Sequence, residues 1–101
     1  MTQIKKPKGD FLDDVYTLLH PMRFRIVELL SEKPMHIAEI SKALGMERRL
    51  ASYHLKVLED SGFLTSKYEI SEEKKSKGKA LRKYTVTDKV ANVKDELKKE
   101  L

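Results

Sequence analysis

Side chains with strong hydrogen-bonding chemistry recur between residues 47 and 56 at the spacing of one helix face. The set comprises Glu47, Arg48, Arg49, Ser52, Tyr53 and Lys56. An arginine guanidinium can pair in a bidentate manner with guanine O6 and N7, which is worth about 1–3 kcal/mol of discrimination between bases. The residue types and their spacing therefore predict contacts with base edges in a DNA groove, led by Arg48 and Arg49.

The other members of this set suit supporting contacts. Ser52 can bond a base or a phosphate, and Tyr53 can stack on a sugar or touch a thymine methyl group. Lys56, one turn later, is expected to meet phosphate. Glu47 fits two roles, since it can accept from cytosine N4 or simply favour the positive end of the helix dipole. The alternative for the whole set is an ordinary solvated helix face.

The excess of positive charge is local rather than spread along the chain. The 101 residues include 21 basic and 16 acidic side chains, and residues 71–83 alone hold six basic and two acidic ones. Clustered lysines bind a polyanion because neutralising phosphates releases counterions. The residues expected to contact phosphates or the minor groove are Lys74, Lys75, Lys77 and Lys79, with Arg82 inserting into the minor groove. A solvated loop that aids solubility is the alternative.

Hydrophobic spacing predicts the helices that position these side chains. Ala51, Leu55 and Leu58 fall at i, i+4 and i+7, which indicates a helix over about 47–61 that ends at Gly62. A short helix over 37–44 precedes it and ends at Gly45, so the two form a helix-turn-helix pair. Two earlier helices are expected over about 10–20 and 21–32.

After Gly62 the pattern changes to β-type residues. Strands are expected near 63–70 and 81–86, with a break in register at Arg82-Lys83, and the basic segment joins them as a wing. Thr87 then caps a last helix that runs to Leu101. The predicted fold class is mainly α with a small β-hairpin (α+β), a winged helix-turn-helix with an extra helix at each end. Residues 1–9 are expected to form a flexible basic arm, and residues 10–101 the domain.

Four stretches resemble one known family. They are LHPMRFRIVELL (19–30), IAEISKALG (37–45), SYHLKVLEDSGFL (52–64) and RKYTVT (82–87). Together, in this order, they resemble the second helix, the first helix-turn-helix helix, the recognition helix with its following strand, and the second wing strand of ArsR-like winged-helix repressors. The resemblance covers about residues 11–90. It implies a homodimeric regulator that binds operator DNA, most often as a repressor.

The resemblance also implies that the terminal helices pair two copies of the chain. The residues expected at that interface are Phe11, Leu12, Val15, Leu19, Val90, Val93, Leu97 and Leu101. A two-fold axis would place the recognition helices about one DNA turn, roughly 34 Å, apart on a pseudo-palindromic operator. The alternative is that the last helix folds back on its own core.

Several kinds of chemistry find no support in the residues. The chain has no cysteine, so the thiolate sites of metal-sensing relatives have no counterpart, and its three histidines show no metal-ligand spacing. No nucleophile, phosphate loop or carboxylate pair with a supporting motif indicates an enzyme. We expect no metal, cofactor or membrane contact and a cytoplasmic location. The sequence does not identify an effector.

Two internal features carry further expectations. His54 borders the apolar face of its helix and is expected to be packed and hydrogen-bonded. Arg23 and Arg25 are expected on the polar side of the second helix, where they can reach DNA phosphates or pair with Glu28 and Glu32. The spacing from Arg25 favours at least one such local ion pair. Two other functions fit the same fold, namely a winged-helix protein-interaction module and a protein that binds nucleic acid without sequence preference.

Overall fold

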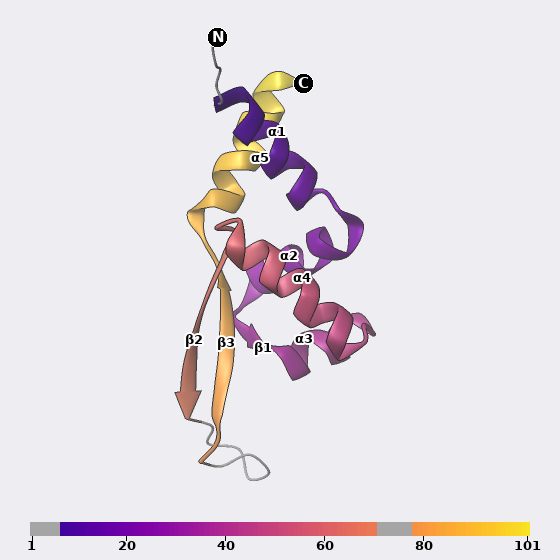
Figure 1. Cartoon of the computed structure of the whole chain (residues 1–101), viewed down its shortest axis with the longest axis vertical. Helices are drawn as coiled ribbons and strands as arrows, with labels where there is room; N and C mark the ends of the chain where they lie inside the picture. The colour runs from indigo at the N-terminus through magenta and orange to yellow at the C-terminus, as the bar shows by residue number, and fades with distance from the viewer. Residues whose placement is uncertain (1–6, 71–77) are drawn as a thin grey trace.

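The computed structural model describes residues 7–70 and 78–101, with the backbone alone for residues 7–9. Figure 1 shows the order of the elements, which confirms the predicted fold class. They are α1 (Pro7–Leu18), α2 (Pro21–Glu32), β1 (Met35–His36), α3 (Ile37–Leu44), α4 (Arg48–Asp60), β2 (Leu64–Ile70), β3 (Ala80–Val86) and α5 (Asp88–Glu100). No helix in this part of the chain has the length and apolar character needed to cross a bilayer.

A tight turn joins α3 to α4, as the sequence predicts. Gly45 adopts φ +61°, a left-handed conformation that side chains with a Cβ rarely take. The amide of Met46 then donates to the Ser41 carbonyl at 3.0 Å, and the Met46 side chain is buried. The turn thereby fixes the angle between the two helices of the helix-turn-helix pair.

The sheet has three antiparallel strands in the order β1-β3-β2. Strands β2 and β3 pair without interruption from Leu64–Val86 to Ile70–Ala80, so the expected break at Arg82-Lys83 is wrong. Adjacent residues in a strand point to opposite faces, and each of these cations finds its own acidic partner there. Strand β1 was not predicted, because a two-residue strand shows no alternation.

The core lies between α2, α3, α4 and the start of the sheet. Its largest fully buried side chains are Leu18, Ile26, Val27, Leu30, Ile40, Leu55, Leu58 and Phe63. Gly62, at φ +86°, turns the chain from α4 into β2. Thr87 caps α5 by accepting from the amide of Lys89 at 3.3 Å, which confirms the predicted cap.

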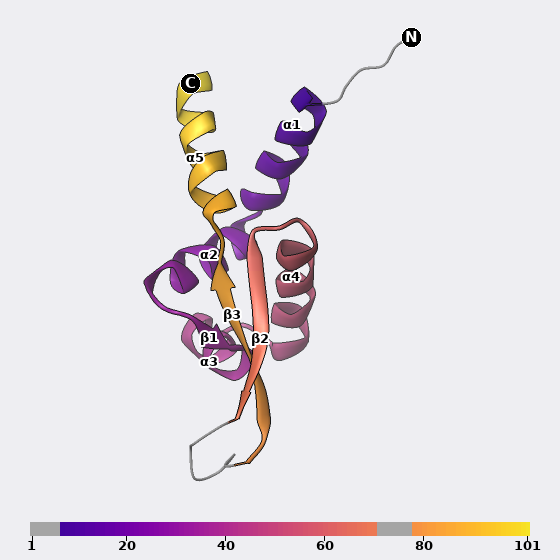
Figure 2. The ribbon, with the colours of Figure 1, turned by 90° about the vertical axis from the view of Figure 1, so that its left-hand side faces the viewer.

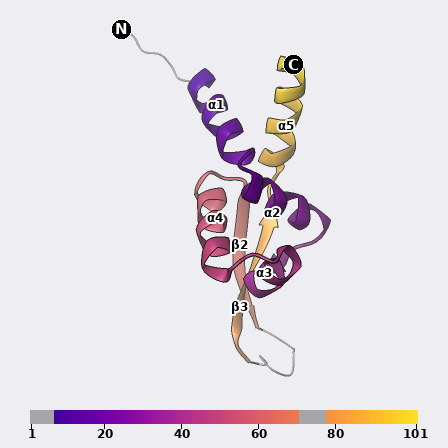
Figure 3. The same cartoon turned by 90° about the vertical axis from the view of Figure 1, so that its right-hand side faces the viewer.

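Helices α1 and α5 form one end of an elongated molecule of 57 × 24 × 22 Å, and the hairpin of β2 and β3 extends toward the other (Figures 2 and 3). Helix α1 begins at Pro7, three residues before the expected start. An ion pair of 3.1 Å between Lys89 and Asp14 joins the two terminal helices. Val90 and Val93 are only 5% and 6% exposed, so this part of α5 packs on the chain's own core.

A polar cluster is buried beneath α4. The Nη1 atom of Arg23 lies 3.4 Å from Nδ1 of His54, whose ring is 4.7 Å from that of His20. The packed, bonded state of His54 agrees with expectation, whereas Arg23, at 7% exposed, is not on a polar helix face. Arg25 donates to the Leu44 carbonyl instead of forming the expected local ion pair. Its expected partner Glu28 pairs with Lys94 at 2.6 Å.

The buried cluster makes stability sensitive to acid. Burial lowers the pKa of His54 below its usual 6.5, and the charges of His20 and Arg23 lower it further. As pH falls through 6.5, His54 therefore becomes protonated in the unfolded chain before it does in the folded chain. The folded state loses stability over this range, until the pH reaches the lowered pKa that His54 has in the folded chain. We expect the melting temperature to fall between about pH 7.5 and about pH 5.5. His54→Gln should flatten that slope. Circular dichroism measures the melting temperature of the parent and of the variant at each pH. An equal fall with pH in both proteins would show that His54 is not the origin of the acid sensitivity.

Candidate nucleic-acid interface

Helix α4 divides sharply into a buried face and an exposed face. Ala51, Leu55 and Leu58 are fully buried against the core. The exposed face carries the residues predicted from the sequence, Arg48, Arg49, Ser52, Tyr53 and Lys56, with Glu47 exposed at the N-cap position. The structure therefore brings all six predicted α4 residues to the surface of one rigid element.

The two arginines stand in the first turn of α4. Neither Arg48 nor Arg49 forms an ion pair with any residue in 7–70 or 78–101. The Glu47 side chain makes no capping hydrogen bond, so it too is available. Three charged side chains at the start of a helix can reach base edges without first breaking an internal contact.

Tyr53 and Leu50 add apolar surface to this face. Tyr53 is 59% exposed, and its ring meets the buried His54 ring edge-on at 5.0 Å. Leu50 is 37% exposed. Leu50 was not among the predicted residues, although its position outside the Ala51–Leu55–Leu58 stripe already indicated an outward side chain.

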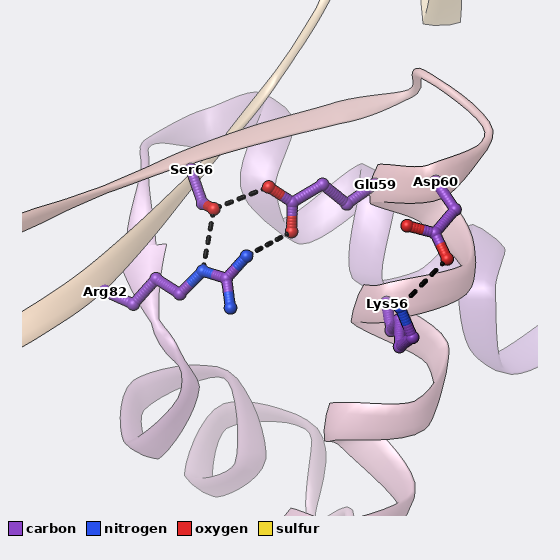
Figure 4. A network of polar contacts seen from close by, with 5 residues as sticks. All are labelled: Lys56, Glu59, Asp60, Ser66 and Arg82. Atoms are coloured by element: carbon purple, nitrogen blue, oxygen red, sulfur yellow. Dashed lines mark hydrogen bonds and ion pairs between the residues drawn. The ribbon is translucent and has the colours of Figure 1, made fainter.

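Lys56 and Arg82 are engaged with acidic neighbours (Figure 4). Lys56 pairs with Asp60 at 3.2 Å, an exposed pair that can exchange for a phosphate at small cost. Arg82 is held more firmly. Its Nη2 donates to Glu59 and its Nε donates to Ser66, each at 2.8 Å, while the Ser66 hydroxyl donates to Glu59 at 2.6 Å.

This network engages the side chain that was predicted to enter the minor groove. The guanidinium bridges α4 and β2 through hydrogen bonds of 2.8 Å, and these bonds tie the hairpin to α4. Burial works to lower the pKa of Arg82, but Tyr84 and Glu59 raise it, and the net shift is upward. Burial also raises the pKa of the Tyr84 phenol. Glu59 and Ser66 were not predicted to hold Arg82, because both contacts are made across the fold.

The hairpin carries the remaining basic residues. Lys79 is exposed beside Gly78, whereas Lys74, Lys75 and Lys77 lie outside the described residues. Figure 2 shows α4 alongside the hairpin, with its first turn toward the end to which the strands extend. The first turn of α4 therefore lies in the half of the molecule that holds the hairpin, away from α1 and α5. Tyr68 and Ile70 also lie exposed on β2.

The residues expected to pair two copies divide into three groups. Leu12, Leu19 and Leu101 are exposed, whereas Phe11, Val15 and Leu97 are half-buried. Val90 and Val93 are buried within the chain, so they are not part of a free surface. Tyr16, which is 81% exposed between Leu12 and Leu19, extends the apolar face of α1 and was missed.

The described residues show no group that could hold a metal ion. No three histidine, aspartate or glutamate side chains come together within residues 7–70 and 78–101.

Comparisons with known proteins agree with this architecture. Residues 18–67, about half of the chain, match the family model of a helix-turn-helix domain. No curated protein sequence matches the chain. Among solved structures, HlyU from Vibrio cholerae N16961 is similar with a TM-score of 0.69 and 18% identity, covering 90% of this chain and 91% of that one.

Two further structures share the fold. The transcriptional repressor BigR from Xylella fastidiosa aligns with a TM-score of 0.63 and 25% identity over 83% of this chain and 74% of that one. The homodimeric winged helix-turn-helix DNA-binding domain of Mb0332 from Mycobacterium bovis, a possible ArsR-family regulator, aligns with a TM-score of 0.65 and 22% identity over 97% and 87%. The chain therefore carries a helix-turn-helix domain and shares the winged fold of these structures.

Proposed function

We propose that this protein is a sequence-specific transcriptional regulator that reads the major groove of double-stranded DNA with α4. The observation that carries the proposal is the exposed polar face of α4, whose first-turn arginines have no ion-pair partner among the described residues. The major groove admits a helix and presents a distinct donor and acceptor pattern for each base pair. Arg48 and Arg49 read guanines, and Ser52 and Tyr53 contact the neighbouring bases or sugars.

The wing supplies affinity rather than sequence reading. Lys74, Lys75, Lys77 and Lys79 meet phosphates of the flanking turn, because lysine acts as a flexible point charge. Arg82 sets where those charges lie by tying the hairpin to α4 through Glu59 at 2.8 Å. The relative placement of helix and wing then fixes how far apart their contacts fall on the duplex.

The regulator acts as a homodimer, most often as a repressor, on a pseudo-palindromic operator. The support is the exposed apolar face of α1, formed by Leu12, Tyr16 and Leu19, in a helix that extends from the body of the chain (Figure 3). The similar domain of Mb0332 is a homodimer, and BigR is a repressor. A two-fold axis through the terminal helices places the two copies of α4 about 34 Å apart, one turn of DNA.

Replacing both first-turn arginines tests the reading helix. Arg48→Ala with Arg49→Ala should remove about 1–3 kcal/mol per arginine of the preference for a selected duplex over a random one. Both side chains are exposed, so the melting temperature should stay close to that of the parent. Fluorescence anisotropy with labelled duplexes at fixed salt measures the ratio of the affinities for the selected and the random duplex.

A matched double variant controls for charge. Lys98→Ala with Lys99→Ala removes the same two charges from exposed positions in the last turn of α5, and should leave the specific-to-random ratio unchanged. If the arginine variant keeps its discrimination, α4 is not the reading element. If the parent itself shows no preference for any duplex, the chain binds nucleic acid without specificity or serves as a protein-interaction module.

A second pair of variants tests the role of Arg82. Glu59→Gln removes a negative charge, which by simple electrostatics favours DNA, yet it loosens the hairpin. We expect duplex binding about twofold to fivefold weaker, the factor for an ion pair of about 0.5–1 kcal/mol. Asp60→Asn makes the same charge change at the next residue and frees Lys56, so it should bind as tightly as the parent or more tightly. Tighter binding by Glu59→Gln would show that Arg82 acts as a DNA contact.

A further inference from the structure

Two large apolar side chains lie exposed on α4, among its charged residues. Leu50 and Tyr53 keep 37% and 59% of their surface open to solvent. Neither belongs to the hydrophobic core or to the partly buried apolar side chains that pack against it. An exposed apolar pair on an otherwise charged helix face therefore calls for an explanation outside the core of this chain.

The helix geometry makes these two side chains one surface with cations at its border. Residues three and four apart are neighbours on a helix, so Tyr53 adjoins Leu50. By the same spacing Tyr53 adjoins Arg49 and Lys56, and both cations are exposed. The centre of a protein–protein interface is depleted of charged residues, whereas a nucleic acid places apolar base groups between rows of phosphates. The charge around the pair therefore favours a nucleic acid as the occupant.

The ring of Tyr53 rests on a rigid support. It meets the ring of His54 edge-on at 5.0 Å, and His54 is buried with its Nδ1 atom 3.4 Å from Nη1 of Arg23. A side chain that is held by its neighbours loses less conformational freedom when it binds. Tyr53 can therefore present one edge of its ring to a partner in a defined place.

The major groove of DNA offers one apolar group that fits such a pair. Base edges there show hydrogen-bond donors and acceptors, and the C5-methyl group of thymine is the apolar element of the pattern. A leucine and a tyrosine edge side by side can enclose a methyl group, while neither aliphatic carbon nor ring carbon can pair with a donor or an acceptor. Thymine is thus the base whose chemistry matches this surface.

We propose that Leu50 and Tyr53 form a contact surface for the C5-methyl group of thymine, so that α4 reads thymine as well as guanine. The proposal rests on the proposed function and adds two residues that determine its specificity. Arg49 and Tyr53 are four residues apart, which is about 6 Å along the helix, and neighbouring bases of a strand are about 3.4 Å apart. The thymine should therefore lie within about two base pairs of a guanine in each half-site.

Replacement of thymine by uracil in a selected duplex tests the contact. Uracil pairs with adenine and keeps the O4 acceptor, so the replacement removes the methyl group alone. The preferred duplex is first selected from a random pool with the full chain, and each thymine is then replaced in turn by deoxyuridine. We expect at least one position per half-site at which the dissociation constant rises about threefold to fivefold, the factor for burial of one methyl-sized group.

Two variants assign the missing methyl contact to this surface. Leu50→Ala and Tyr53→Ala should each bind the thymine and the uracil duplex with nearly equal affinity, because the side chain that touches the methyl group is gone. The matched variant Ile70→Ala removes an exposed apolar side chain from β2 and should keep the ratio of the parent. Melting temperatures show that each variant is folded, and fluorescence anisotropy at fixed salt measures the affinities.

The outcomes separate this assignment from the proposed function. If no duplex is enriched from the pool, the proposed function fails and the assignment fails with it. If a duplex is enriched but no thymine in it is sensitive to loss of its methyl group, the assignment alone is overturned. It is also overturned if the sensitivity survives in both alanine variants, because the methyl group then acts on the shape of the DNA or on another part of the protein. Loss of the ratio in either folded variant supports the contact.

Discussion

Burial of one side of α4 is the constraint on which the rest of the molecule depends. Leu55 and Leu58 are fully buried, and each contributes about 1.5–3 kcal/mol by leaving water. A rotation of the helix by one residue would expose them and force Arg48 or Ser52 into the core. Because that exchange costs several kilocalories per mole, the polar face is held outward in one orientation, and a rigid helix can present it to a duplex.

The same logic places the wing and the polar cluster. Glu59 lies near the end of α4, and its bonds with Arg82 and Ser66 fix the hairpin relative to the exposed face. Beneath the helix, His54 and Arg23 satisfy each other in the core. Helix α4 is therefore held by apolar packing along its length and by a polar contact at each of two points, one to the hairpin and one to α2.

Local patterns were enough to predict the helices, the turn at Gly45 and the outward residues of α4, because periodicity and capping act over a few residues. Contacts between distant residues were not predictable in this way. Arg23 and Arg82 were both assigned to solvent or DNA, since a lone arginine in a polar context gives no sign of a partner 23 or 31 residues away. The strand β1 was missed because its pairing with β3, rather than its own pattern, defines it.

The most direct measurement of the central claim is selection of bound duplexes from a random pool with the full chain. A face of α4 that reads bases, presented twice by a dimer, should enrich one sequence arranged as an inverted repeat, with half-sites about one helical turn apart. Enrichment of a single unrepeated site would contradict the proposed dimer but would support base reading by α4. A pool that shows no enrichment would contradict the account, because the exposed arginines would then contribute charge without recognition.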